Sequence, residues 1–420
     1  MSNLANQTNT LFNKWDTDHT PGCMLAVIQD GDTIYERGYG MANLETNEPI
    51  SPDSVFYIAS TSKQFTTACI LLLSQSDKLT LDDDIRKYIP EMPTYDKPIT
   101  IRHLIHHTSG LRDSLTLLNL SGIDTTTAVY SNADLIQLIV RQQELNFSPG
   151  TQHKYCNAGY LLMAEIVERI SGQTFRQFAH DNIFAPLGMN NTHFDDNHTE
   201  HIPHRVVSYH SDGDSYKPYP KNFDIVGSGG LLTTVGDLAL WDLNFYNPKV
   251  GDAKFLDTFC GRGSLDNGDE IFYGFGLYIG DYKGLRTIHH PGGMLGFSTD
   301  LYRFPDQQFS VVILSNLQGF DAAFHCRNVA DIYLADHFQL NDYPGQYYSE
   351  ELNITYTLEV TDGELFITSP DIYDKPLEAK LGNAFQTGSK NILFTRDAKQ
   401  NITGFDIKTD RVFNIHFKKV

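Results

Sequence analysis

The sequence predicts an α+β fold, with an antiparallel sheet built from both ends of a first domain beside a helical half, and with a separate all-β domain at the C-terminal end. Three observations support this prediction. Strand patterns occur near both ends of residues 1–340, helical patterns lie between them, and short alternating segments fill residues 341–420. A chain of 420 residues is long enough for one large domain and one smaller domain.

The N-terminal elements follow from apolar spacing and from one turn. Residues 1–18 have the spacing of an amphipathic helix, and residues 23–40 form two strands joined at Gln29-Asp30-Gly31-Asp32, a good hairpin turn. Apolar residues 57–59 then lead into a helix that continues through apolar residues 68–73.

The middle of the chain is mainly helical, and strand patterns return after it. The predicted helices are residues 99–107, 133–145, 159–171 and 175–184. The predicted strands are residues 272–279, 287–290, 297–304 and 309–315, and a helix over residues 321–337 follows them. These strands are expected to join the N-terminal pair in one sheet.

From Tyr343 onwards the sequence changes to short alternating segments, so we place the domain boundary near residues 339–344. The predicted strands are residues 355–360, 364–368, 391–395, 402–407 and 412–417. The turn signals between them are Thr361-Asp362-Gly363, Leu381-Gly382-Asn383, Asp397-Ala398-Lys399 and Lys408-Thr409-Asp410. This pattern predicts a small up-and-down barrel or a sandwich.

The composition is that of a globular protein, with 40% apolar and 20% charged residues. The formal net charge of −20 argues against nucleic acid or an anionic membrane as the main partner, because both attract a basic surface. The sequence contains no apolar run of 18 residues, so we expect no integral membrane segment. The sequence is compatible with a homo-oligomer as well as with a monomer.

The five cysteines are scattered and have no Cys-x-x-Cys spacing, which predicts reduced thiols and neither a disulfide framework nor a metal site. We also expect no cofactor. The first 20 residues are polar, unlike a signal peptide. The sequence as written therefore predicts a cytoplasmic protein, and a periplasmic or secreted protein is the alternative if an export leader was removed.

Ser60 and Lys63 lie one helical turn apart at the start of a predicted helix. Residues i and i+3 share a helix face, so the Lys63 amine can reach the Ser60 oxygen and help to deprotonate it. The helix N-terminus favours an oxyanion there. By itself, the Ser-x-x-Lys spacing fits a serine N-cap and a solvated lysine equally well.

Two further clusters offer the groups that such a serine needs. Tyr155-Cys156-Asn157 follows a Pro-Gly break, where alternate side chains can face one cleft, and a neighbouring cation would lower the pKa of Tyr155 and favour its ionised form. His290 stands at a strand end before Gly292 and Gly293, which let a substrate approach the backbone closely. Each cluster alone fits an ordinary loop.

Taken in order, Ser60-Thr61-Ser62-Lys63, Tyr155-Cys156-Asn157 and His290-Pro291-Gly292 resemble the three motifs of the serine β-lactamase and penicillin-binding protein superfamily. The resemblance is closest to its class C-like branch, which includes D-aminopeptidases, alkaline D-peptidases, carboxylesterases and the class C β-lactamases, and it covers roughly residues 10–335. It implies a β-lactamase/transpeptidase-like domain. Residues 341–420 resemble the lipocalin-like barrel domain appended to several of these hydrolases.

The resemblance implies a role for each motif. Ser60 would be the acylated nucleophile, and Lys63 and Tyr155 would form the proton relay. The N–H groups of Ser60 and Gly293 would hold the oxyanion, and Asn157 would contact Lys63 and the substrate amide. The expected substrate-binding residues are Asn157, His290, Gly292 and Gly293.

The third motif departs from the β-lactamase form, which has Lys-Thr-Gly or Lys-Ser-Gly. His290 stands in place of the lysine, and Pro291 lacks both the hydroxyl and the N–H of its family counterpart. Because a histidine has no permanent charge at physiological pH, penicillins are expected to be poor substrates.

Three other groups of residues have a functional and a structural interpretation. Cys156 fits a small packing residue better than a nucleophile, because no histidine adjoins it in sequence. His103, His106 and His107 have a spacing that suits zinc, but the helix lacks the glutamate of a metal-protease motif, so we expect packing. Asp224 could hold a substrate ammonium, and a solvated loop carboxylate is the preferred alternative.

These observations predict a serine hydrolase of the SxxK acyl-enzyme type that acts on short peptides or amides, in the manner of D-aminopeptidases and D-peptidases. A carboxylesterase or a weak β-lactamase of the same fold is the nearest alternative. A non-catalytic ligand-binding sensor is the alternative from another class, and the intact Ser60, Lys63 and Tyr155 favour an enzyme over it.

Overall fold

The computed structural model describes residues 3–125, 127–338, 340–361, 363–369, 372–380, 384–397 and 401–420. The chain divides into two compact units, one of Met1–Ile279 and Ile288–Val329 and the other of Gly280–Thr287 and Ala330–Val420. The boundary expected between residues 340 and 341 stays a prediction. Gln339 and the turn signals at Asp362, at Leu381-Gly382-Asn383 and at Ala398-Lys399 lie outside the described residues.

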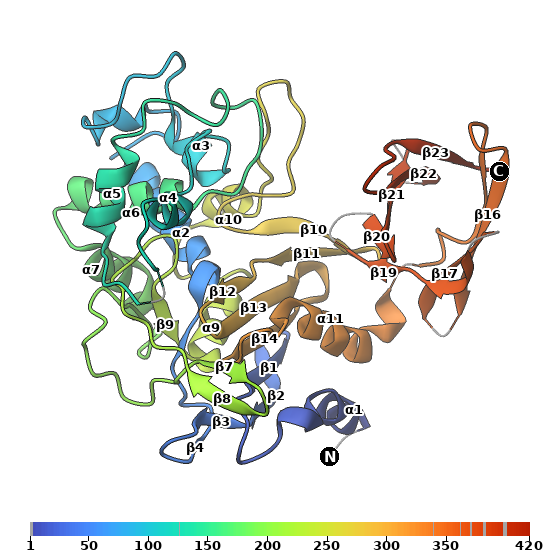
Figure 1. The fold of residues 1–420 in the computed structure, drawn as a ribbon, viewed down its shortest axis with the longest axis horizontal. Helices are drawn as coiled ribbons and strands as arrows, with labels where there is room; N and C mark the ends of the chain where they lie inside the picture. Colours follow the sequence, from blue (N-terminus) through green and yellow to red (C-terminus); the bar gives the residue numbers. More distant parts are fainter. Residues whose placement is uncertain are drawn as a thin grey trace. The chain divides into compact units, whose positions relative to one another are not determined.

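A seven-stranded antiparallel sheet has the strand order β10-β11-β13-β14-β1-β2, with β12 paired to β13 (Figure 1). Its strands are β1 (Cys23–Gln29), β2 (Asp32–Tyr39), β10 (Tyr278–Tyr282), β11 (Leu285–His289), β12 (Gly292–Met294), β13 (Phe297–Phe304) and β14 (Phe309–Ser315). β1 pairs with β14 along its whole length. The prediction of one sheet built from both ends of the first domain is confirmed.

The hairpin between β1 and β2 turns at two residues with positive φ. Asp30 has φ 54° and Gly31 has φ 85°. A two-residue turn with positive φ at both positions matches the right-handed twist of the strands that it joins, and Asp-Gly is among its preferred sequences.

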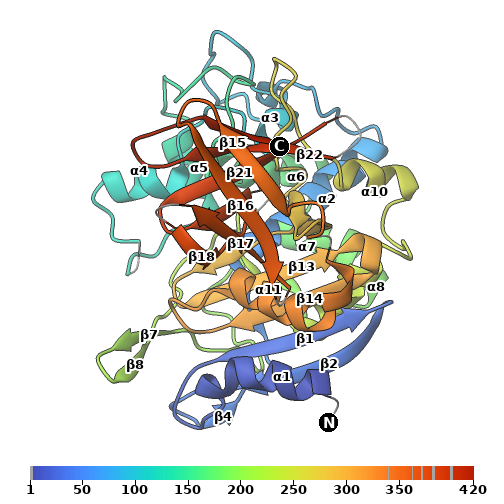
Figure 2. The ribbon, with the colours of Figure 1, turned by 90° about the vertical axis from the view of Figure 1, so that its right-hand side faces the viewer.

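Helices cover both faces of the sheet, which is why β1 and β14 are buried almost throughout. Alternate side chains of β1 face the core shared with the helical half, namely Met24, Ala26 and Ile28. On the opposite face, Phe12 of α1 (Asn3–Phe12) stacks on Tyr39 of β2 with ring centroids 5.0 Å apart. Phe12 also contacts His325 of α11 (Ala322–Tyr333), so both helices lie over this face (Figure 2).

The helical half lies on one side of the sheet and is centred on α2 and α6, which pack together (Figure 1). Its helices are α2 (Lys63–Gln75), α3 (Ile101–Ile105), α4 (Ser114–Leu120), α5 (Asn132–Ile139), α6 (Asn157–Ser171), α7 (Phe175–Ala179), α8 (Ala185–Leu187), α9 (Val235–Leu243) and α10 (Ala253–Phe259). Short strands lie before and between them: β3 (Met41–Asn43), β4 (Glu48–Pro49) and β5 (Phe56–Tyr57) precede α2, and β6 (His193–Phe194), β7 (Tyr209–Asp212), β8 (Ser215–Pro218) and β9 (Leu231–Thr233) lie between α8 and α9.

Two predicted elements in this region differ from the structure by more than two residues at one end. The helix expected over residues 133–145 ends at Ile139, and the carbonyl of Gln142 accepts a hydrogen bond from Tyr95 Oη, 2.7 Å away, in place of a helical partner. The strand expected over residues 272–279 begins only at Tyr278. Gly276 has φ 71°, and a Cβ there would lie 2.6 Å from the Lys63 carbonyl carbon, so this segment turns tightly against the start of α2.

The second unit contains a nine-stranded antiparallel sheet with the order β18-β17-β16-β15-β23-β22-β21-β20-β19, which forms a nearly closed barrel. Its strands are β15 (Gly345–Ser349), β16 (Ile354–Thr361), β17 (Glu364–Ser369), β18 (Ile372–Pro376), β19 (Glu378–Ala379), β20 (Ala384–Thr387), β21 (Lys390–Arg396), β22 (Ile402–Lys408) and β23 (Ile415–Lys419).

The interior of the barrel is aromatic. The Phe405 ring lies 4.9 Å from that of Tyr347 and 4.7 Å from that of Phe417, centroid to centroid. The all-β prediction is confirmed, although alternation alone missed β15 and β18–β20. The strand expected over residues 412–417 begins only at Ile415, and Phe413 is exposed.

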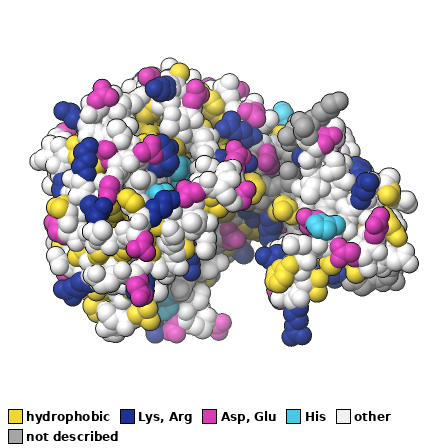
Figure 3. Space-filling view, turned by 90° about the horizontal axis from the view of Figure 1, so that it is seen from above, with side chains coloured by type: hydrophobic (Ala, Val, Ile, Leu, Met, Phe, Trp, Pro, Cys, Tyr) yellow, Lys and Arg dark blue, Asp and Glu magenta, His cyan; other side chains and the backbone are white. Residues whose placement is uncertain are grey.

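Side chains of both charge signs are interspersed on the face of the molecule drawn in Figure 3. The helices in the part of the chain that the structure describes are all too short or too polar to span a membrane.

A buried ion pair joins the sheet to the helical half. Arg303 of β13 donates from Nε to Asp242 of α9 over 2.7 Å, and Ser310 of β14 donates to the same carboxylate over 2.9 Å. The two charged side chains are 0% and 2% exposed. Such a pair is costly to break, because the remaining charge stays buried without a partner.

We expect Arg303→Met to lower the free energy of unfolding by about 3–5 kcal/mol, because it leaves the Asp242 carboxylate buried and unpaired. Urea unfolding followed by circular dichroism measures the loss. Arg102→Met is the matched control, since Arg102 pairs with an exposed Asp82 and its removal should cost no more than about 1 kcal/mol. Equal losses in the two variants would contradict this account of the buried pair.

Candidate active site

Ser60 sits on a sharp turn at the entrance to α2. A 3-10 turn, Ala59–Ser62, leads directly into this helix, and Ala59 has φ 47°, which a residue with a side chain rarely adopts. Two hydrogen bonds hold the preceding Ile58: its N–H donates to Leu231 O over 3.0 Å, and its carbonyl accepts from Thr299 Oγ1 over 2.9 Å. The turn is therefore fixed by strands on both sides, with Ser60 half-buried at its tip.

The third motif is fastened to this turn. Thr61 Oγ1 donates to the carbonyl of His290 over 2.9 Å. A Cβ on Gly292 would lie 2.2 Å from Ile58 O, so the backbone of β12 approaches the turn more closely than any other residue type would allow. Gly292 thus has a packing role, and Thr61 is a contact that sequence reasoning missed.

The Lys63 amine is buried beneath Ser60. Nζ lies 2.9 Å from Ser60 Oγ, 2.9 Å from Asn157 Oδ1 and 2.5 Å from the carbonyl oxygen of Ser228. Burial lowers the pKa of Lys63 from its usual value to about 7, and the charge of Asp113 opposes this shift. At neutral pH, an appreciable fraction of Lys63 is therefore the neutral amine, which can accept a proton.

Asp113 orients the amide that faces Lys63, and it was missed by sequence reasoning. Asp113 Oδ2 accepts from the Asn157 backbone N–H over 2.8 Å and from Asn157 Nδ2 over 3.0 Å, which turns Asn157 Oδ1 towards the lysine. The same aspartate caps α4 through the N–H of Thr116. Only this capping pattern, an aspartate before a helix, was visible in the sequence.

Tyr155 donates from Oη to Ser60 Oγ over 2.9 Å. Burial raises the pKa of Tyr155 well above its usual value, although the hydrogen bond with Ser60 acts in the opposite direction. The interpretation that a neighbouring cation ionises this phenol is wrong, because desolvation outweighs it. Tyr155 is a protonated donor at neutral pH.

His107, which was expected only to pack, contacts the second motif, Tyr155-Cys156-Asn157. Its ring lies 4.4 Å from that of Tyr155, and its Nδ1 accepts from the Cys156 backbone N–H over 3.1 Å. Cys156 is itself buried, and burial raises the pKa of its thiol to about 12, which agrees with a packing role. Among the described residues, no group of three His, Cys, Asp or Glu side chains is placed to hold a metal ion.

His290 is buried and neutral. Its Nδ1–H donates to Pro291 O over 2.7 Å, and its Nε2 accepts from Tyr273 Oη over 3.1 Å. Burial lowers the pKa of His290 well below its usual value, and the nearby Lys63 charge lowers it further. Both ring nitrogens are therefore engaged by protein groups, and the imidazole has a structural role at the site.

A small pocket of about 70 Å³ opens at Ser60. Of the expected substrate-binding residues, Asn157 and Gly293 line it, whereas His290 and Gly292 do not. Its apolar wall consists of Tyr57, Leu115, Phe223, Ile225 and Met294.

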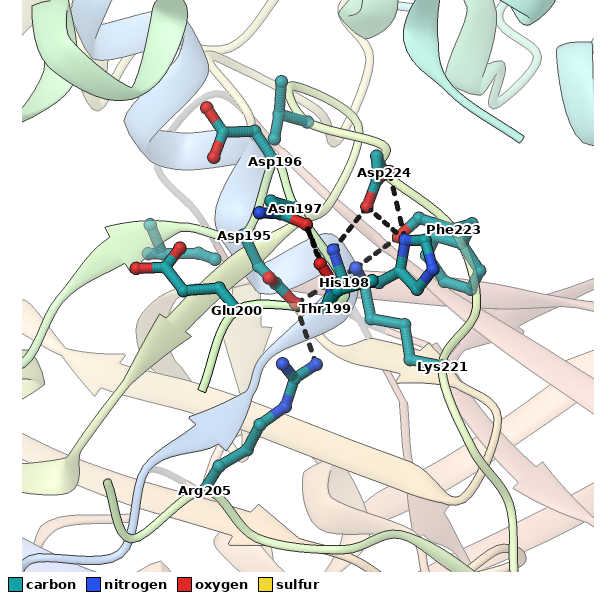
Figure 4. Close-up of polar contacts among 12 residues, drawn as sticks. Asp195, Asp196, Asn197, His198, Thr199, Glu200, Arg205, Lys221, Phe223 and Asp224 are labelled. Carbon is teal, nitrogen blue, oxygen red and sulfur yellow. Dashed lines mark hydrogen bonds and ion pairs between the residues drawn. The ribbon is translucent and has the colours of Figure 1, made fainter. Parts of the chain in front are cut away.

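Asp224 points away from this pocket. Its neighbours in sequence, Phe223 and Ile225, line the pocket, whereas the Asp224 carboxylate accepts from the backbone N–H of His198 over 2.6 Å and contacts His198 Nδ1 at 2.9 Å (Figure 4). Adjacent side chains on an extended segment point in opposite directions, which is why Asp224 is turned to the other side. The interpretation of Asp224 as an anchor for a substrate ammonium is therefore wrong.

Comparisons with known proteins show which family this chain resembles. The sequence profile of the Beta-lactamase family matches residues 8–334. Penicillin-binding protein 4* of Bacillus subtilis is 30% identical over 330 residues, which cover 75% of this chain and 72% of that protein. A D-aminopeptidase of Brucella anthropi is 27% identical over 313 residues, or 74% of this chain, but the match spans only 59% of its length.

A solved structure shares the whole fold. The octameric penicillin-binding protein homologue from Pyrococcus abyssi superposes with a TM-score of 0.70 at 21% identity, and the match covers 99% of both chains. Because the profile match extends over more than half of the chain and the strand order and helical half agree with the expected fold, the chain belongs to the beta-lactamase family, within the serine β-lactamase and penicillin-binding protein superfamily.

Proposed function

We propose that this protein is a serine hydrolase that forms an acyl-enzyme on Ser60 and acts on short peptides or amides. The observation that carries the proposal is the position of two proton carriers, Lys63 Nζ and Tyr155 Oη, each 2.9 Å from Ser60 Oγ. A nucleophile within hydrogen-bond reach of a base, which is itself oriented by a third group, is the arrangement that nucleophilic catalysis needs. Here Asn157 orients the base.

The reaction begins with transfer of the Ser60 proton to the neutral amine of Lys63. Ser60 Oγ then bonds to the substrate carbonyl carbon, and the N–H groups of Ser60 and Gly293 hold the resulting oxyanion. Tyr155 gives its proton to the leaving nitrogen or oxygen, the carbon–leaving-group bond breaks, and the Lys63 ammonium restores the proton through the relay. Water attacks the acyl-enzyme by the same steps in reverse and releases the acid.

The pocket and the relatives both bear on the substrate class. The D-aminopeptidase relatives support an amide or peptide substrate, and the small apolar wall around Ser60 favours a short acyl group. A short-chain ester is the second candidate, because the same apolar wall accepts a neutral acyl chain without an ionic anchor. The octameric state of the Pyrococcus homologue supports a homo-oligomer as part of this proposal.

Replacing the nucleophile tests the proposal directly. Ser60→Ala should abolish labelling by a fluorophosphonate probe and lower kcat for any substrate by at least about 1,000-fold, because the covalent step is lost. In-gel fluorescence of the labelled protein measures the first effect. Ser76→Ala is the matched control, since this exposed serine only bonds back to its own helix. Labelling that persists in Ser60→Ala would refute the acyl-enzyme.

The pH dependence should report the titration of Lys63. Because the neutral amine is the active form and its pKa is lowered to about 7, kcat/KM should fall as the pH drops through about 7. Asp113→Asn removes the charge that raises the pKa of Lys63, so its acidic limb should move to lower pH. Rates measured in a stopped assay between pH 5 and 9 would show the acidic limb of the wild type and that of Asp113→Asn. An unmoved limb in Asp113→Asn would contradict Lys63 as the base.

Substrate preference should follow from the neutral His290 and the apolar wall. A D-alanyl anilide and a short nitrophenyl ester should each be hydrolysed with a kcat/KM at least about tenfold above that of nitrocefin, because the carboxylate of nitrocefin finds no cation at His290. Side-by-side progress curves at one enzyme concentration measure this order. Nitrocefin turnover above both other substrates would overturn the assignment away from β-lactams.

A further inference from the structure

Residues 221–228, which we call the wall segment, connect a buried ion pair to Lys63 in the candidate active site. The segment places Phe223 and Ile225 in the pocket wall, and the carbonyl of Ser228, at its other end, accepts from the Lys63 amine. Its position therefore affects both the shape of the pocket and the environment of the lysine.

The first residue of the wall segment is held by buried charges. Lys221 Nζ lies 3.0 Å from Asp195 Oδ2, and the two side chains are 3% and 0% exposed. Arg205 Nη2 contacts the same oxygen at 2.8 Å (Figure 4). A buried ammonium that moved away from its carboxylate would be an unpaired buried charge, which is costly. The ion pair therefore confines Lys221 to one position.

Lys221 in turn touches Phe223 at two points. Its Nζ donates a hydrogen bond to the carbonyl of Phe223 and lies 4.8 Å from the centre of the Phe223 ring. A cation over an aromatic face is attracted by the ring quadrupole, more strongly when water is excluded. The ring also stacks on Tyr130, with centroids 5.2 Å apart and planes 22° apart. The aromatic wall is thus held by both Lys221 and Tyr130.

The middle of the wall segment has its own anchors. The Asp224 N–H donates to Tyr130 O over 2.8 Å, and its carboxylate binds His198. Val226 exchanges two hydrogen bonds with the side chain of Asn132. These contacts hold the backbone after Phe223, and Lys221 holds the backbone before it together with the ring.

We propose that Lys221, held by Asp195, is a positioning residue that keeps the Phe223 ring in the wall of the acyl pocket, so that this ion pair limits the size of the acyl group that reaches Ser60. The inference rests on the proposed function, because it assigns the pocket to the acyl group of the substrate. Phe223 is the residue that meets the acyl chain, and Lys221 acts through it.

Acyl-chain selectivity provides the test. The ratio of kcat/KM for 4-nitrophenyl hexanoate to that for 4-nitrophenyl acetate is measured in wild type, Phe223→Ala, Lys221→Met and the double variant. Each single variant should raise the ratio roughly tenfold, because a longer chain then fits beside Ser60. For acetate, KM should rise while kcat stays near the wild-type value.

The double variant separates positioning from a general structural effect. If Lys221 acts through Phe223, the double variant should have the same ratio as Phe223→Ala alone, since residues that work as one unit are not additive. Lys217→Met is the matched control, because Lys217 pairs with Asp212 on the exposed β8 hairpin and should leave the ratio unchanged. An unchanged ratio in Lys221→Met or Phe223→Ala, or multiplied effects in the double variant, would overturn the inference.

Asp195→Asn keeps the test decisive if Lys221→Met does not fold. It loosens Lys221 without altering the lysine, so the ratio should rise in the same direction, and an unchanged ratio would again overturn the inference. Failure of the proposed function is recognised separately. If the wild type shows no Ser60-dependent fluorophosphonate labelling, the acyl-enzyme is refuted and the inference falls with it. A labelled wild type with unchanged ratios in the variants refutes only the role of Lys221.

Discussion

The burial of the Lys63 amine is the constraint on which the rest of the site depends. Away from water, this group needs hydrogen-bond partners from the protein, and it finds Ser60 Oγ, Asn157 Oδ1 and the Ser228 carbonyl on three segments far apart in the chain. These contacts tie α2, α6 and the wall segment together. The same burial lowers the pKa of Lys63 to about 7. The group that assembles the site is therefore also the group best able to accept the serine proton at neutral pH.

The third motif contributes shape without charge. His290 uses both ring nitrogens on protein partners, Pro291 O and Tyr273 Oη, and its carbonyl receives the Thr61 hydroxyl. A buried neutral imidazole satisfied in this way is stable where a lysine ammonium would need another anion. The neutral imidazole and the aromatic ring of Phe223 in the pocket wall both agree with the proposed preference for short neutral acyl groups.

Much of the fold was predictable because its signals are local. The Asp30-Gly31 turn and the strands on either side of it depend on neighbours in sequence, and the sheet built from both ends of the domain follows from the order of such elements. The errors arose where distant contacts override local pattern. Residues 140–145 leave the helix, with Gln142 bonded to Tyr95, and residues 272–277 leave the extended form because Gly276 turns against the backbone of Lys63.

In the candidate site, too, local sequence signals and distant contacts determined different properties. The sequence by itself singled out Ser60, Lys63 and Tyr155, because Ser60 and Lys63 sit one helical turn apart and the other two motifs follow in order, and the structure brings these three side chains together. Only the tertiary structure decided how those residues behave. It added Asp113 behind Asn157, kept Tyr155 protonated by burying it, and turned Asp224 away from the pocket. Protonation and orientation depend on desolvation and on partners that lie tens to hundreds of residues away, and no local pattern contains that information.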